Sequence, residues 1–382
     1  MQEMVGAIRP LLSLQIIRIN GEIVIMLNRE IYQLDPVENQ LANNGVAKVK
    51  DDLSDQALKV LRYELKTFVC DGEYEDGMER ILNSYLINLN DDHEQKCVWI
   101  SGFFGSGKSH MAKMLRALWV EQSFADGLTA SNIAELPISI KDHFKELSMA
   151  ATRNGGRHAA SGTLGAGANN NVRLALLNII FKSAGLPEDY NLARFIIWLK
   201  KENYYDKVKT FVENEGDDWI DEIDDLLMSH SISNALIDID PTLASDVKGM
   251  RQLLQAQFPI VTDVTNTQMV NAITDALSND GKFPLTLIVL DEVQQYVGSD
   301  SDKAHLVQEV VEICSDHPGF NNKLLFVGTG QNALSGMPNL QRLMGRFQIN
   351  VQLSDTDVES VIRKVILQKK ESAKAELDTV LK

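Results

Sequence analysis

The chain has 382 residues, 44% of them hydrophobic and 24% charged, and its net charge is −16. These values exclude a globally disordered protein, suggest two or three domains, and argue against a phosphate-neutralising surface over the whole molecule. No apolar run reaches the roughly 18 residues that span a bilayer, so we expect no membrane partner. Three widely spaced cysteines, without a zinc pattern, favour a reducing, cytoplasmic compartment; they are Cys70, Cys97 and Cys314.

The first 90 residues predict a mixed lead-in segment. Apolar runs on either side of Asn20-Gly21 are typical of a β-hairpin with a two-residue turn. The alternative is that Met26 is the native start and that the earlier residues are an upstream extension. From Ser54 to Leu89 the apolar spacing is helical, and Asp71-Gly72 divides this stretch into two helices.

Three apolar runs predict buried strands at residues 97–101, 285–290 and 323–327, and a helix at 109–121 follows the first of them. Continuous apolar strands that are separated by helices are typical of a parallel sheet covered on both faces. The sequence therefore predicts an α/β fold with a central parallel sheet.

Residues 151–280 interrupt this pattern. The segment 152–171 is rich in Gly, Ala and Asn, and we expect a surface loop there. The alternative is a contact loop for a partner or for DNA, formed with Arg153, Arg157 and His158. The remainder predicts helices. The carboxylates of 213–225 indicate a solvated helical face, because their spacing is not that of a calcium loop.

One motif points directly to chemistry. The phosphate-loop pattern G-x-x-x-x-G-K-[ST] is matched by Gly102-Phe103-Phe104-Gly105-Ser106-Gly107-Lys108-Ser109, with a predicted strand before it and a helix after it. Glycines let backbone N–H groups wrap phosphates where a Cβ would obstruct them, and a helix N-terminus adds positive partial charge. Lys108 would contact the β- and γ-phosphates of ATP, and Ser109 would bind Mg²⁺. His110 joins the binding residues, with a packing role as the alternative.

Polar residues follow the other two predicted strands. Asp291 would hold Mg²⁺ through water, and Glu292 would act as general base toward the attacking water. The alternative for Asp291 is a helix cap. Thr329 and Gln331 would contact the γ-phosphate or the water, unless they are turn residues that bond their own backbone.

Two arginines lie near the last predicted strand. Arg346 is expected to reach the nucleotide of a neighbouring subunit, and Arg342, four residues earlier, is the second choice. The alternative is an arginine in a surface salt bridge. Phe347 and the alternating apolar residues after it would anchor the strand in the core.

The order of these motifs resembles the AAA+ branch of the P-loop ATPases, which includes origin-recognition and clamp-loader ATPases. The stretch Val98–His110 is similar to the phosphate loop of the large ATPases of bacteriophage-exclusion (BREX) defence systems, the BrxC/PglY family. The Asn-rich segment 43–48 and the helical pair after it also resemble that family. The resemblance is good over about 30–120, fair over 283–353, and weak between them.

The resemblance implies an AAA+-like P-loop NTPase core with a large helical insertion. The long separation of Lys108 from Asp291 fits an insertion with its own packing. Family members are normally far longer, so we expect an N-terminal fragment or a shortened relative. The expected units are a lead-in at 1–90, the ATPase core at 91–150 and 281–353, the glycine-rich loop and helical insertion at 151–280, and the start of a C-terminal helical region at 354–382.

The residues themselves predict ATP hydrolysis with Mg²⁺. The resemblance implies more: a phage-defence module that couples nucleotide state to assembly or remodelling of partners on DNA. The implied partners are a methyltransferase and a phosphatase-like subunit, together with self-association through the nucleotide edge. Two alternatives stay open. One is a DNA-loading ATPase of the replication-initiator or clamp-loader type, and the other is a nucleotide-gated scaffold with little hydrolysis.

Overall fold

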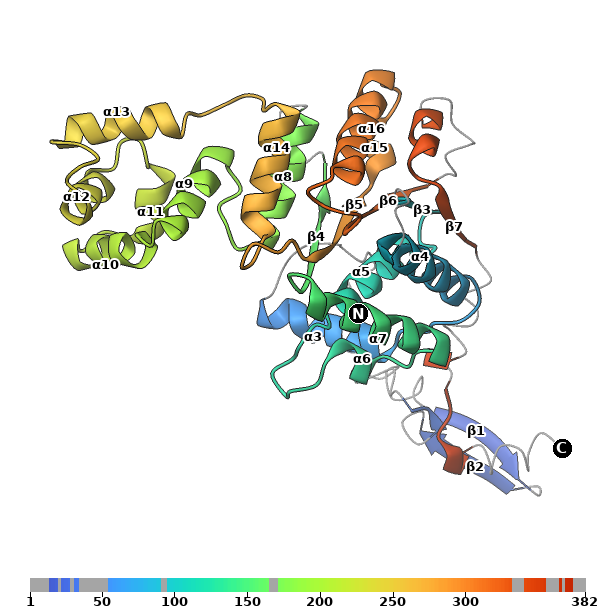
Figure 1. Cartoon of the computed structure of the whole chain (residues 1–382). Helices are drawn as coiled ribbons and strands as arrows, with labels where there is room; N and C mark the ends of the chain where they lie inside the picture. Colours follow the sequence, from blue (N-terminus) through green and yellow to red (C-terminus); the bar gives the residue numbers. More distant parts are fainter. Residues whose placement is uncertain are drawn as a thin grey trace.

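The computed structural model describes residues 14–19, 22–27, 31–33, 54–90, 95–164, 171–331, 340–354, 364–365 and 368–373. At its centre lies a five-stranded sheet in which all neighbouring strands are parallel, in the order β4-β5-β6-β3-β7 (Figure 1). The strands are β3 (Val98–Gly102), β4 (Arg157–Thr163), β5 (Leu285–Asp291), β6 (Leu324–Gly330) and β7 (Ile349–Leu353). This arrangement confirms the predicted α/β fold.

Helices cover both faces of the sheet. Successive residues of a strand point to opposite faces, so strands that are apolar throughout need a helical layer on each face. On one face Val98 and Ile100 join a hydrophobic cluster with the first group of helices, and on the other face Trp99 joins a second cluster. Every residue of β3, β5 and β6 is therefore buried. The first group is α3 (Asp55–Lys66), α4 (Gly72–Asn90), α5 (Lys108–Trp119), α6 (Ala130–Ile133) and α7 (Ile138–Arg153).

The second face carries a different set of helices. They are α8 (Val172–Ser183), α14 (Asn266–Leu277), α15 (Val293–Val297) and α16 (Ser301–Asp316), with the short 3₁₀ helix η2 (Gln341–Gly345) beside α16. β7 alternates between buried and exposed residues, with Ile349, Val351 and Leu353 facing inward. Phe347 is also fully buried, as the sequence predicts.

A helical lobe extends from this second face and lies to the left in Figure 1. Aromatic rings form its centre: Phe195 lies 5.5 Å from Phe258 and 6.0 Å from Trp198, measured between ring centroids. Such rings bury large apolar areas, and their cluster is continuous with the apolar residues on the second face of the sheet. Its helices are α9 (Tyr190–Lys201), α10 (Tyr205–Glu215), α11 (Trp219–Asp224), α12 (His230–Ile239) and α13 (Val247–Gln257).

The expected surface loop at 152–171 is wrong for much of its length. Residues 157–163 form β4, an edge strand whose pairing with β5 runs from Arg157 to Thr163. Its residues are mostly small because α8 packs closely: a Cβ on Gly162 would lie 2.8 Å from Ile179 Cγ1. Two of the three side chains proposed for a contact loop are engaged within the fold: Arg157 donates to Ser148 Oγ at 2.9 Å, and His158 Nε2 lies 2.8 Å from Ser183 Oγ. The third, Arg153, ends α7 and is exposed. Residues 165–170 lie outside the described residues.

Two further segments complete the description. Strands β1 (Leu14–Ile19) and β2 (Glu22–Leu27) pair antiparallel with Ile19 opposite Glu22, which confirms a hairpin around Asn20-Gly21; the turn residues themselves lie outside the described residues. Near the other end, Tyr32 forms an isolated bridge with Lys369. The expected C-terminal helical region at 354–382 lies mostly outside the described residues, and this bridge falls within it. Within the described ranges, no helix is long and apolar enough to cross a membrane.

Candidate functional site

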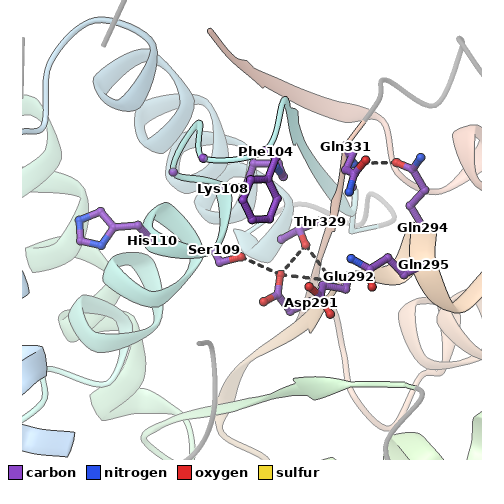
Figure 2. Close-up of a pocket in the computed structure, with 13 residues that line it drawn as sticks. Phe104, Lys108, Ser109, His110, Asp291, Glu292, Gln294, Gln295, Thr329 and Gln331 are labelled. Carbon is purple, nitrogen blue, oxygen red and sulfur yellow. Dashed lines mark hydrogen bonds between the residues drawn. The ribbon is translucent and has the colours of Figure 1, made fainter. Parts of the chain in front are cut away.

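The sheet topology brings the predicted motifs together. Because β6 lies between β3 and β5, the carboxyl ends of these three parallel strands meet at one edge, where open α/β sheets bind ligands. A cavity of about 220 Å³ opens there, and Figure 2 shows its lining side chains. The lining residues are Phe104, Gly105, Gly107, Lys108, Ser109, His110, Asp291, Glu292, Gln294, Gln295, Thr329, Gly330 and Gln331.

The loop between β3 and α5 has a backbone that glycine makes possible. Gly107 has a φ of 88°, and a Cβ there would overlap Tyr74 Oη, while a Cβ on Gly102 would overlap Ser106 Oγ and Leu353 O. Tyr74, from α4, donates a hydrogen bond to Ser106 O at 3.3 Å. The lead-in helix α4 therefore supports the loop directly.

Lys108 begins α5 and its ammonium lies over the loop. Nζ donates hydrogen bonds of 2.8 Å to Gly102 O and to Phe103 O. Burial lowers the pKa of Lys108, and the nearby Asp291 carboxylate raises it in opposition. Lys108 lines the cavity together with Phe104, whose ring is exposed, and brings an ammonium group to it.

A hydrogen-bond network connects the three strand ends. Asp291 Oδ1 accepts from Ser109 Oγ at 3.1 Å and from Thr329 Oγ1 at 2.5 Å. Thr329 Oγ1 accepts in turn from the backbone N–H of Glu292 at 2.9 Å. Asp291 and Thr329 are buried, and buried polar groups that are satisfied in this way fix the geometry of a site. Asp291 does more here than cap a helix.

Glu292 has a backbone conformation that non-glycine residues rarely adopt. Its φ is 57° and its ψ is 32°, in the left-handed region, where a side chain costs about 1–2 kcal/mol. Its carboxylate is exposed at the cavity. The Thr329 hydroxyl holds this strained peptide by accepting from the Glu292 N–H. Such strain clusters at functional sites.

His110 borders the cavity, yet its ring packs elsewhere. Figure 2 shows the ring directed away from Asp291, and its centroid lies 5.7 Å from that of Phe68 in an edge-on contact. Burial, with a smaller contribution from Lys113, lowers the pKa of His110 to about 4. The ring is therefore neutral at neutral pH, in agreement with a packing role.

Three lining residues were not singled out from the sequence. Gln294 and Gln295 lie on α15, and Gly330 ends β6. Gln294 Oε1 accepts from the backbone N–H of Gln331 at 2.7 Å, which ties the Gln331 peptide to α15. The adjacent amides two and three residues after Glu292 were the available signal.

The remaining predicted residues occupy other places. Gly102, Phe103 and Ser106 belong to the loop but do not line the cavity. Arg346 forms ion pairs with Glu312 at 2.9 Å and Asp316 at 2.6 Å on α16. This is the intrachain salt bridge that the sequence left open, and the role of Arg346 toward a neighbouring subunit stays a prediction.

The Arg342 side chain lies outside the described residues. Its role therefore also stays a prediction. Among the described residues, no group of three or more His, Cys, Asp and Glu side chains is arranged to hold a metal ion. The side-chain oxygen atoms of Ser109 and Asp291 lie 3.1 Å apart, and their role as Mg²⁺ ligands stays a prediction.

No model of a known protein family matches the chain.

Proposed function

We propose that this protein is a P-loop ATPase that binds ATP with Mg²⁺ at the carboxyl ends of β3, β5 and β6. The observation that carries the proposal is the 3.1 Å hydrogen bond from Ser109 Oγ to Asp291 Oδ1. It joins the residue after the phosphate-loop lysine to the acidic end of a buried strand, across 182 positions of sequence. A glycine turn that matched the pattern by chance would have no reason to meet this carboxylate.

The residues of the site fit both the phosphates of ATP and Mg²⁺. Gly107 has a positive φ, and Tyr74 and Leu353 approach so closely that no Cβ fits at Gly107 or Gly102. The loop therefore has the glycine-dependent backbone that a cradle for phosphates requires. The N-terminus of α5 adds positive partial charge, and Lys108 adds a full charge. A hydroxyl and a carboxylate are hard oxygen ligands of the kind that Mg²⁺ prefers. Bound Mg²⁺ would neutralise charge that develops on the phosphate oxygens.

The chain's own residues divide the remaining work. The Lys108 ammonium has three donors, two of which bond loop carbonyls. When ATP binds, these donors turn to phosphate oxygens. Glu292 presents an exposed carboxylate that takes a proton from water. Thr329 acts as a positioning residue, because its hydroxyl bonds both Asp291 and the Glu292 peptide. Phosphoryl transfer depends mainly on such positioning and on electrostatic stabilisation.

The wider role is proposed from sequence resemblance alone. An AAA+-like core of the BREX type would couple the nucleotide state to assembly or remodelling of phage-defence partners in the cytoplasm, with self-association through the nucleotide edge. The net charge of −16 does not support a broad DNA-binding surface. The buried network around Asp291 favours hydrolysis over a scaffold with little activity.

The experiment is a calorimetric titration of the full chain with ATP and Mg²⁺. We expect Lys108→Ala to weaken ATP binding by at least about 10²-fold, because charged hydrogen bonds contribute about 1.5–3 kcal/mol each. Lys141→Ala, at an exposed lysine of α7, is the matched control and should bind ATP as the wild type does. Equal affinity of all three proteins would overturn the proposal.

A further inference from the structure

A second cavity lies outside the nucleotide site, between α9, the end of α13 and α14. Its volume is about 310 Å³, at the lower end of the roughly 300–1,000 Å³ of small-molecule sites. It shares no lining residue with the cavity at the strand ends. Aromatic surface from Tyr190, Trp198 and Phe258 meets the side-chain amides of Gln257 and Asn271 there.

Arg194 is the central charged group of this second cavity. Its guanidinium carbon lies 5.6 Å from the ring centroid of Tyr190 and 5.9 Å from that of Phe258, close enough for cation–π attraction. In the part of the chain that the structure describes, no carboxylate forms an ion pair with it. A guanidinium held over two rings is a preorganised set of donors for an anion.

The other charged lining groups cancel each other. Lys201 Nζ and Asp275 Oδ1 form an ion pair of 2.6 Å at the rim. Arg194 therefore leaves the cavity with one positive charge in excess, which matches a monoanion. The surrounding region 172–280 has 9 Lys and Arg against 18 Asp and Glu, and this acidic field repels a polyanion such as nucleic acid.

The remaining lining groups define the rest of the ligand. Trp198, Tyr190 and Phe258 offer apolar and aromatic surface, which suits a planar or apolar body. Gln257 and Asn271, whose side-chain amides form no hydrogen bond within the described residues, supply further donors beside the guanidinium. We propose that this cavity binds a small organic carboxylate that carries an aromatic or apolar group.

Phenylacetate is a suitable probe, because it combines one carboxylate with one aromatic ring. Its binding to the full chain is measured by saturation-transfer NMR and calorimetry. We expect saturable binding that weakens at least tenfold in Arg194→Gln and by a smaller factor in Arg194→Lys, which keeps the charge but loses the planar donors. Phenylacetamide, the neutral analogue, should bind at least tenfold more weakly than phenylacetate. Circular dichroism melting of Arg194→Gln checks that the variant is folded.

Two controls locate the binding and fix the class of ligand. Lys207→Gln removes one positive charge from an exposed position of α10 and should leave phenylacetate affinity unchanged. Lys108→Ala should also leave it unchanged, which separates this cavity from the nucleotide site and makes the result independent of ATPase activity. No saturable phenylacetate binding, equal affinity for phenylacetamide, tighter binding of phenyl phosphate, or full affinity in folded Arg194→Gln would each overturn the proposal.

Discussion

The carboxyl edge of the sheet and the helical lobe differ in what they bury. At the edge, polar groups are buried and the backbone is strained, as at Asp291, Thr329 and Glu292. In the lobe, the aromatic rings of Phe195 and Phe258 are buried against each other, and the carboxylates of 213–225 are mostly exposed. Apolar packing in the lobe therefore contributes more to the free energy of unfolding than the polar edge does. At the carboxyl edge, hydrogen bonds instead hold buried polar groups and a strained backbone in place.

The largest expected effect on stability is in the lobe. Phe195→Ala removes a fully buried ring and should lower the free energy of unfolding by about 3–5 kcal/mol, measured by urea denaturation. At temperatures where the variant is folded, its ATP affinity should equal that of the wild type. A folded variant that has lost ATP binding would show that the two regions are not separable.

A smaller effect is expected at the edge, with the opposite signature. Gly107→Ala places a Cβ against Tyr74 Oη at a φ of 88° and should weaken ATP binding at least tenfold by calorimetry, because the loop must shift. Gly185→Ala is the matched control: its φ is 67° and nothing lies within 4 Å of the added Cβ. It should cost about 1 kcal/mol of stability and leave ATP affinity unchanged. Equal ATP affinity of the two variants would contradict the proposed cradle.

The smallest effect concerns Arg346, whose backbone carbonyl accepts a hydrogen bond from the N–H of Cys97 just before β3. Its ion pairs with Glu312 and Asp316 leave it 16% exposed, so Arg346→Ala should lower the free energy of unfolding by about 1–2 kcal/mol. Lys145→Ala breaks a pair whose side chains are 74% and 61% exposed and should change stability by less than about 0.5 kcal/mol.

The same arginine gives a test of the neighbouring-subunit role. A purely intrachain role predicts normal hydrolysis by folded Arg346→Ala protein. Lost hydrolysis that Lys108→Ala protein restores on mixing would instead support action across a subunit boundary, because Lys108→Ala protein keeps its arginine.

Much of the edge can be predicted from the sequence, because its information is local. The phosphate-loop pattern is one contiguous run from Gly102 to Ser109, and the run that ends at Asp291 is seven residues long as β5. This order of glycine, lysine and hydroxyl residues is typical of a phosphate-binding loop. The parallel sheet follows from the same apolar runs.

What the sequence did not predict depends on tertiary contacts. β4 has the sequence RHAASGT, in which only the two alanines are apolar. Its burial comes from α8 on one face and from the first group of helices on the other. The left-handed backbone of Glu292 depends on Thr329, 37 positions away. Gln294 reaches the cavity only because β6 lies between β3 and β5. A local sequence pattern does not show which distant residues will be in contact.

Glu292→Gln is the decisive test of the proposed ATP hydrolysis at this edge of the sheet. The variant keeps the shape of the side chain but loses the base. The account predicts that Glu292→Gln binds ATP with wild-type affinity by calorimetry and hydrolyses it about 10²–10⁴-fold more slowly in a phosphate-release assay. Hydrolysis by Glu292→Gln at the wild-type rate, with ATP bound normally, would contradict it.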